Sequence, residues 1–220
     1  MTPPFNRIFA AILFDMDGTL INSIAVAERV WGAWARRHGL DVAKFLPTIH
    51  GRRVPETIAG AGIPGIDIAR ESAEITAAEL EDVEGIVPIP GAIELLASVP
   101  AERQALVTSA PRALALRRLA AAGITPPRII VSGDDVSRGK PAPACYLLAA
   151  QRLGIYAADC LVVEDTPAGI AAGETAGATV LVINATHHEP LITPHTQRPS
   201  FASLRIEVKS DGWLRVRETG

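Results

Sequence analysis

Ala11-Ile12-Leu13-Phe14-Asp15-Met16-Asp17-Gly18-Thr19-Leu20 is the stretch that decides the fold. Its four leading apolar residues are typical of a buried strand, and they end at two carboxylates spaced i and i+2. Ligands of open α/β sheets bind beyond the carboxyl ends of the strands, which is where this pair would lie. Such a pair suits a hard cation such as Mg²⁺, and one carboxylate could act as a nucleophile in phosphoryl transfer.

Similar apolar runs recur along the chain and alternate with helical patterns, which predicts βα units and a parallel sheet. Several of the expected helices open with proline, and three are followed by a glycine that can cap them. The strands are expected at residues 11–14, 104–108, 129–132, 160–163 and 179–183. The helices are expected at residues 90–98, 111–122, 143–153 and 167–176. The predicted fold class is α/β, a Rossmann-like parallel sheet with helices on both faces.

Residues 22–87 interrupt this alternation, because they show helical periodicity and no convincing strand pattern. An insert of this size between the first and second strands predicts an α-helical cap domain over the strand ends. The α/β core would then consist of residues 1–21 and 88–220, with the two linkers acting as the hinge. At the other end of the chain, the alternation over 204–208 and the Asp211-Gly212 pair predict a C-terminal β-hairpin.

The composition excludes several classes of protein. Of 220 residues, 48% are hydrophobic and 20% charged, which is typical of a globular chain with a full core. The formal net charge is −3 without a basic tract, so we expect no nucleic acid or membrane partner. Residues 1–7 lack the apolar segment of a signal peptide, and no apolar run is long enough to span a membrane. Cys145 and Cys160 fit neither a metal motif nor a disulfide framework, which favours a cytoplasmic location.

Three further polar clusters follow apolar strands and would reach the same edge of the sheet. They are Thr108-Ser109, Lys140 in the string Gly139-Lys140-Pro141, and Glu164-Asp165. A lysine is a natural counter-charge for a carboxylate and a phosphate oxygen. A hydroxyl before a helix can cradle phosphate, although Ser or Thr at such a place is more often simply an N-cap.

These four clusters, in this order, resemble the four motifs of the haloacid dehalogenase-like hydrolases, and the resemblance covers the chain from about residue 9 to 183. Within that superfamily the chain is similar to the helical-cap subgroup of sugar-phosphate phosphatases, glycerol-phosphate phosphatases and β-phosphoglucomutase. The resemblance implies a Mg²⁺-dependent phosphatase that acts on a small sugar or polyol phosphate through an aspartyl-phosphate. We expect it to work as a monomer or weak dimer.

The resemblance also assigns roles to residues of the core. Asp15 would attack phosphorus, and Asp17 would protonate the leaving oxygen and then activate water. Thr108 and Lys140 would complete the catalytic set. Residues that would hold the metal are Asp15, Asp17 through its carbonyl, Asp165, and Glu164 either directly or through water.

Substrate-binding residues are expected in both parts of the chain. In the core these are Gly18, Ser109 and Arg112, although Arg112 could equally be a solvated helix arginine. In the insert, the string His50-Gly51-Arg52-Arg53 resembles the cap loop of glycerol- and sugar-phosphate phosphatases. The alternative is that these two arginines are simply exposed at a turn.

Two other functions stay open. A phosphomutase of the β-phosphoglucomutase type would use the same core chemistry but exclude water. A non-catalytic phosphometabolite-binding protein is disfavoured, because Asp15, Asp17, Lys140 and Asp165 are all present. The chain also has Asn22-Ser23 where many relatives have Asp-Ser, a change expected to affect the hinge or cap contact and not the chemical step.

Overall fold

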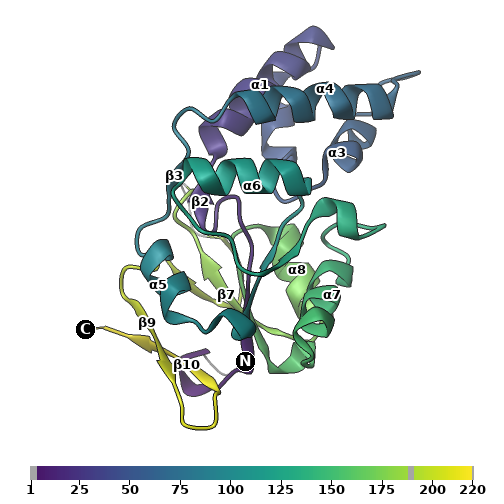
Figure 1. Ribbon diagram of the computed structural model, residues 1–220. Helices are drawn as coiled ribbons and strands as arrows, with labels where there is room; N and C mark the ends of the chain where they lie inside the picture. Colours follow the sequence, from purple (N-terminus) through teal and green to yellow (C-terminus); the bar gives the residue numbers. More distant parts are fainter. Residues whose placement is uncertain (1–3, 188–190, 220) are drawn as a thin grey trace.

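A six-stranded parallel sheet forms the centre of the molecule in the computed structural model, which describes residues 4–187 and 191–219 (Figure 1). The strand order is β5-β4-β1-β6-β7-β8, and each neighbouring pair is parallel. The strands are β1 (Ala11–Phe14), β4 (Gln104–Val107), β5 (Ile129–Val131), β6 (Cys160–Glu164), β7 (Thr179–Ile183) and β8 (Thr196–Arg198). Only β8 was not predicted, and its three polar residues carry no strand pattern.

Helices cover both faces of this sheet. On one face Ile12 and Phe14 of β1 pack with side chains of α5 (Ala92–Ser98) and α6 (Arg112–Ala121). On the other face Ala11 and Leu13 pack with side chains of α7 (Ala144–Leu153) and α8 (Pro167–Thr175). Successive side chains of a strand point to opposite faces, so an entirely apolar β1 is what a doubly covered sheet requires.

Residues 24–81 form a helical cap with its own hydrophobic core. That core includes Trp31, Trp34, Phe45, Ile58 and Ile75. Its helices are α1 (Ile24–Arg37), α2 (Val42–Phe45), α3 (Val54–Gly60) and α4 (Ile68–Glu81). The parallel sheet, the helices on both faces and the inserted helical cap confirm the predicted fold class.

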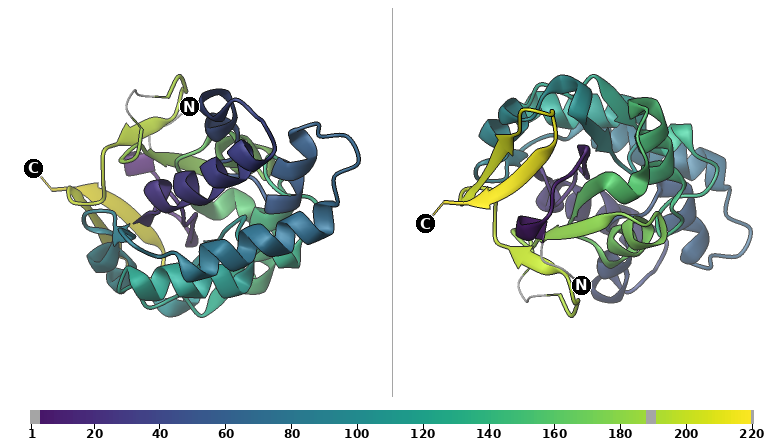
Figure 2. Two further views of the ribbon diagram at one scale, coloured as in Figure 1. Left: turned by 90° about the horizontal axis from the view of Figure 1, so that it is seen from above. Right: turned by 90° about the horizontal axis from the view of Figure 1, so that it is seen from below.

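The two chain segments that join cap and core lie side by side. Strand β2 (Ile21–Asn22) pairs antiparallel with β3 (Val87–Pro88), so that Ile21 is opposite Pro88. The segment that enters the cap and the segment that leaves it therefore form one narrow two-stranded ribbon. In Figure 1 this ribbon lies between the sheet and the cap helices, and Figure 2 shows α1 and α4 nearest the viewer when the molecule is seen from the cap side.

The predicted C-terminal hairpin is present, at the end of the molecule opposite the cap (Figures 1 and 2). It consists of β9 (Leu204–Val208) and β10 (Leu214–Glu218). Gly212 has a positive φ of 80° in the connecting turn, and its N–H donates to the Lys209 carbonyl at 2.9 Å. The hairpin contributes Leu204 and Leu214 to the core on the α5 side of the sheet.

Short 3₁₀ helices complete the structure: η1 (Pro4–Asn6), η2 (Leu46–Thr48), η3 (Ala101–Arg103), η4 (Gly133–Asp135) and η5 (Ala157–Asp159). Among the described residues, no helix has both the length and the apolar character needed to cross a membrane.

Candidate active site

Three neighbouring strands deliver polar side chains to one place. Asp15 directly follows β1, Thr108 follows β4, and Glu164 is the last residue of β6. All three are buried, and β1 lies between β4 and β6 in the sheet. Because the strands are parallel, their carboxyl ends meet at one edge, which is where such sheets bind ligands.

Lys140 is the central cation of this edge, with only 2% of its surface exposed. Its Nζ donates to Asp15 Oδ1, to Glu164 Oε1 at 2.6 Å and to the Val107 carbonyl at 3.3 Å. Burial alone would lower the pKa of Lys140, but the carboxylates of Asp15 and Glu164 outweigh it and raise that pKa. Lys140 is therefore held as a cation beside Asp15.

Glu164 is fully buried and has partners at both oxygens. Oε1 also accepts a hydrogen bond from the Tyr146 hydroxyl at 2.9 Å, and Oε2 accepts from the backbone N–H of Asp165 at 2.8 Å and of Thr166 at 3.0 Å. Burial would raise the pKa of Glu164, yet Lys140 and the backbone N–H groups outweigh it and lower that pKa. Glu164 is thus an ionised carboxylate that fixes Lys140.

Asp165 completes a buried group of three carboxylates. Its Oδ1 accepts a hydrogen bond from Thr19 Oγ1 at 3.1 Å, and its Oδ2 lies 3.5 Å from His187 Nε2. Burial raises the pKa of Asp165 to about 6, although the nearby imidazole of His187 opposes this. Burial also raises the pKa of Asp15. Lys140 opposes this increase, and the charges of Glu164 and Asp165 add to it.

This arrangement fits a divalent cation. Ligand oxygens of Asp15, Glu164 and Asp165 all lie within 4.8 Å of one another. Lys140 balances one of the three negative charges, so two charges are left for a cation to neutralise. Gly18 closes the group, because a Cβ at this position would lie 2.0 Å from Asp165 Oδ2. Gly18 also has a φ of +88°, and its own N–H donates to the Ile21 carbonyl at 2.8 Å.

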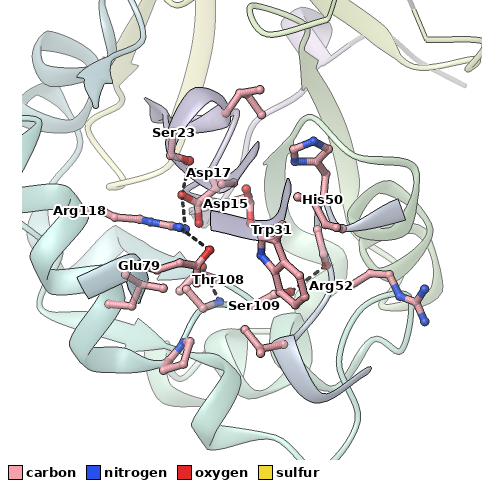
Figure 3. Close-up of a pocket in the computed structure, with 18 residues that line it drawn as sticks. Asp15, Asp17, Ser23, Trp31, His50, Arg52, Glu79, Thr108, Ser109 and Arg118 are labelled. Atoms are coloured by element: carbon pink, nitrogen blue, oxygen red, sulfur yellow. Dashed lines mark hydrogen bonds and ion pairs between the residues drawn. The ribbon is translucent and has the colours of Figure 1, made fainter. Parts of the chain in front are cut away.

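Asp17 lies beside Asp15 but has different partners. Its Oδ1 accepts hydrogen bonds from Ser23 Oγ at 2.5 Å and from Arg118 Nη1 at 2.9 Å. The other guanidinium arm, Nη2, donates to Glu79 Oε1 of α4 at 3.0 Å. Figure 3 shows this chain of contacts on one side of the cavity, reaching from the core into the cap.

A cavity between cap and core opens onto both aspartates (Figure 3). Thr108 and Ser109 line it from the core, and Trp31 and His50 line it from the cap. The Ser109 hydroxyl donates to the Gly51 carbonyl at 2.9 Å, which joins the two parts. Burial lowers the pKa of His50, which favours a neutral imidazole at the cavity wall.

The three arginines expected to bind substrate do not point at the two aspartates. The exposed side chain of Arg52 belongs to the cavity wall, but its guanidinium points away from the aspartates (Figure 3). Arg53 donates to the carbonyls of Val136 at 2.6 Å and Ser137 at 2.9 Å, outside the cavity. Arg112 is exposed and also outside it. Substrate contacts by these arginines therefore stay predictions.

The sequence interpretation missed Arg118, Glu79 and Tyr146. A signal exists for the first two. Arg118 lies between the buried positions Leu114 and Leu119 in the helical period of α6, and Glu79 continues the face of Ile75 on α4. A charged residue on the buried face of an amphipathic helix indicates a buried partner.

Comparison with known proteins agrees with this geometry. The family model described as a haloacid dehalogenase-like hydrolase matches residues 9–177. Hexitol phosphatase A of Escherichia coli is 42% identical over 185 residues, covering 81% of this chain and 84% of that protein. Glycerol-1-phosphate phosphohydrolase 2 of Saccharomyces cerevisiae is 32% identical over 202 residues, covering 84% and 78%.

A similar solved structure is that of CbbY from Rhodobacter sphaeroides in complex with phosphate. It superimposes with a TM-score of 0.68 and 28% sequence identity. The match covers 88% of this chain and 95% of CbbY, so it includes both the sheet and the cap.

Proposed function

Because the chain belongs to the haloacid dehalogenase-like hydrolase family, we propose that it is a Mg²⁺-dependent phosphatase of a small sugar or polyol phosphate, acting through an aspartyl-phosphate on Asp15. One observation carries the proposal. Asp15 is a buried carboxylate that Lys140 holds at the carboxyl end of β1, and it faces a cavity that also contains Asp17. The names of hexitol phosphatase A and glycerol-1-phosphate phosphohydrolase 2 support the substrate class.

Asp15 is arranged to act as the nucleophile. Lys140 binds its Oδ1, and Oδ2 accepts no hydrogen bond within the described residues. In the proposed first step Oδ2 attacks phosphorus, a bond forms between Asp15 and the phosphoryl group, and the bond to the leaving oxygen breaks. Lys140 would hold Asp15 by its Oδ1 during this step, and Thr108 lines the cavity that Asp15 faces.

Asp17 is arranged to move the protons. Its Oδ1 is held by Ser23 and Arg118, and we assign Oδ2 to the reacting groups. In the first step Oδ2 gives a proton to the leaving alkoxide, so that an alcohol departs. In the second step the same oxygen takes a proton from water as that water attacks phosphorus, which releases phosphate and restores Asp15.

The buried carboxylates would hold the cation. We assign this to Asp15, to Asp165 and to the backbone carbonyl of Asp17, with Glu164 acting through water because its own oxygens already have protein partners. When bound, Mg²⁺ would neutralise the repulsion between the Asp15 carboxylate and a phosphate dianion.

We assign the cap to residues 22–87, which would close over the core by bending at the β2–β3 ribbon. The paired linkers and the separate apolar core of the cap support this assignment. We also propose a cytoplasmic monomer or weak dimer without nucleic acid or membrane partners. The net charge of −3 and the two free, buried cysteines support that setting.

A panel of phosphorylated sugars, polyols and glycolate tests the proposal. Phosphate release should occur with Mg²⁺, stop with EDTA and return when Mg²⁺ is added in excess. Failure to release phosphate from any compound of the panel, or activity that EDTA does not affect, would contradict it. Conversion of glucose 1-phosphate to glucose 6-phosphate without phosphate release would identify the mutase alternative instead.

A further inference from the structure

Arg118 is a buried arginine at the boundary between core and cap, with 4% of its surface exposed. It extends from α6, and its two Nη atoms donate to two different carboxylates, Asp17 of the core and Glu79 of the cap. Its Nε has no hydrogen-bond partner in the part of the chain that the structure describes. Burying a guanidinium is costly unless it is paired, so these two carboxylates decide where the Arg118 side chain lies.

The contact of Arg118 with Asp17 has a direct geometric effect. Arg118 and Ser23 both donate to the same oxygen, Oδ1, so they fix the rotation of the carboxylate. The other oxygen, Oδ2, accepts no hydrogen bond from the described residues, and Asp17 lines the same cavity as Asp15. A general acid is effective only when its proton lies within hydrogen-bond reach of the leaving oxygen, so this orientation matters for the reaction.

We propose that Arg118 is a positioning residue for Asp17, and that Glu79 holds Arg118 in its working position only while the cap lies against the core; this role rests on the proposed phosphatase function. The planar guanidinium fork suits this task, because it binds two carboxylates in fixed directions. Glu79 is 3% exposed and belongs to α4, so it would leave Arg118 when the cap opens. Closure of the cap and orientation of Asp17 are therefore energetically coupled.

The leaving group of the ester provides the readout. p-Nitrophenolate departs readily without a proton, whereas the more basic phenolate of phenyl phosphate depends on an acid. The ratio kcat/KM reports the steps up to transfer of the phosphoryl group, so it is sensitive to Asp17 acting as the acid. A residue that acts through Asp17 must affect phenyl phosphate more than p-nitrophenyl phosphate, and a folding defect must affect both equally.

Arg118→Met should lower kcat/KM for phenyl phosphate by about 10- to 100-fold, and for p-nitrophenyl phosphate by less than about threefold. Arg118→Lys keeps the charge but lacks the two arms that bind two carboxylates. Its loss of kcat/KM on phenyl phosphate should therefore be smaller than that of Arg118→Met. Glu79→Gln should also lower kcat/KM for phenyl phosphate more than for p-nitrophenyl phosphate, but by a smaller factor than Arg118→Met. The proposal would be overturned if, in both Arg118 variants, kcat/KM fell by the same factor for phenyl phosphate as for p-nitrophenyl phosphate.

Matched controls lie next to both residues. Arg117→Met changes the neighbouring arginine, which is exposed and donates to the Leu80 carbonyl of α4 at 3.3 Å. Glu81→Gln changes an exposed glutamate at the end of the same cap helix as Glu79. Neither control should change the ratio between the two esters. A shift in Arg117→Met as large as that in Arg118→Met would also overturn the proposal.

The double variant Asp17→Asn/Arg118→Met separates action through Asp17 from independent action. With Asp17 replaced, Arg118→Met should have little further effect on phenyl phosphate, and fully additive losses would contradict the proposal. These assays use aryl esters, so they do not depend on the natural substrate. A wild-type protein active on aryl esters and inactive on every sugar and polyol phosphate would contradict only the proposed substrate class. Inactivity on both aryl esters and on every compound of the sugar and polyol panel would overturn both proposals.

Discussion

Asp15 and Asp17 are two positions apart in the chain, yet their surroundings differ. Lys140 and two further buried carboxylates surround Asp15, whereas a serine and an arginine hold Asp17 at the cavity wall. The carboxylate pair and the lysine could be predicted because each belongs to a local string of residues. Arg118 could not be assigned a partner, because its contacts depend on how the cap meets the core.

Gly18→Ala should remove most of the activity. The new methyl group would lie 2.0 Å from Asp165 Oδ2, and the backbone φ of +88° disfavours a side chain. Displacement of Asp165 should lower kcat/KM by about 100-fold or more. Gly177→Ala is the matched control, since Gly177 has a φ of +82° and no atom within 4 Å of a built Cβ. Equal kcat/KM in wild type and Gly18→Ala would refute this role of the glycine.

Mg²⁺ should stabilise the folded protein, because three buried carboxylates share one lysine. At 100 times the Kd, binding to the native state should raise Tm by about 5–10 °C. EDTA should reverse the shift, and Asp165→Asn should abolish it. The measurement is a thermal melt at constant ionic strength, with Na⁺ in place of Mg²⁺ as the control. A Tm that does not respond to Mg²⁺ would argue against the assigned cation site.

At the scale of elements, the sequence predicted the strands whose residues are buried on both sides. Strands β1, β4, β6 and β7 are apolar runs, and apolar runs bounded by turn residues are readily recognised. Strand β8 has three residues, and β2 and β3 have two each. They are strands because they pair with a neighbouring strand, and their composition does not indicate it. No local pattern can predict such pairing.

Helices α1 and α4 of the cap are joined through one buried carboxylate. Glu71 is 2% exposed and accepts hydrogen bonds from Trp34 Nε1 at 2.9 Å and from Arg37 at 2.6 Å. Glu71→Gln should lower Tm by several degrees, because Arg37 would lose its buried, negatively charged partner. Glu74→Gln is the control: Glu74 contacts the same Arg37 at 2.8 Å but is half-exposed, so its loss should matter little. Equal Tm changes in the two variants would contradict this account.

The same contacts predict a pH dependence of stability. Hydrogen bonds from Arg70 and Trp34 lower the pKa of Glu71 from its ordinary value of 4.5 to about 2. A lowered pKa in the folded state stabilises the protein above pH 4.5, and this contribution is lost as the pH falls towards 2. Tm should therefore fall over this interval, and less steeply in Glu71→Gln. Identical slopes in both proteins would remove Glu71 as a source of acid sensitivity.

At the scale of the whole molecule, contacts between cap and core decide the closed arrangement. Arg53 and Glu56 of the cap bind the loop before Lys140: Arg53 donates to two of its carbonyls, and Glu56 accepts from the Gly139 N–H at 2.9 Å. These contacts place the cap loop against the segment that carries Lys140. Sequence patterns indicated that a cap exists, but not which of its residues face the core and which face the cavity.

Arg53→Ala should therefore impair closure and not selectivity. We expect kcat/KM to fall by about 10- to 100-fold for every substrate in parallel, because bonds between cap and core are lost. His50→Ala, which alters the cavity wall, should instead change the preference among sugar and polyol phosphates. Rates on the full panel, including the smallest ester, separate the two effects. A changed preference in Arg53→Ala would instead support the prediction that this arginine contacts substrate.

The central claim, a covalent intermediate on Asp15, is tested most directly by trapping it. Asp17→Asn with p-nitrophenyl phosphate should form the aspartyl-phosphate without an acid and hydrolyse it slowly for want of a base. Borohydride reduction after rapid quenching would convert a phosphorylated aspartate to homoserine, which peptide mass spectrometry locates. We predict a burst of p-nitrophenolate with homoserine at position 15, and neither in Asp15→Asn/Asp17→Asn. Turnover without a burst, or a label at another residue, would contradict the account.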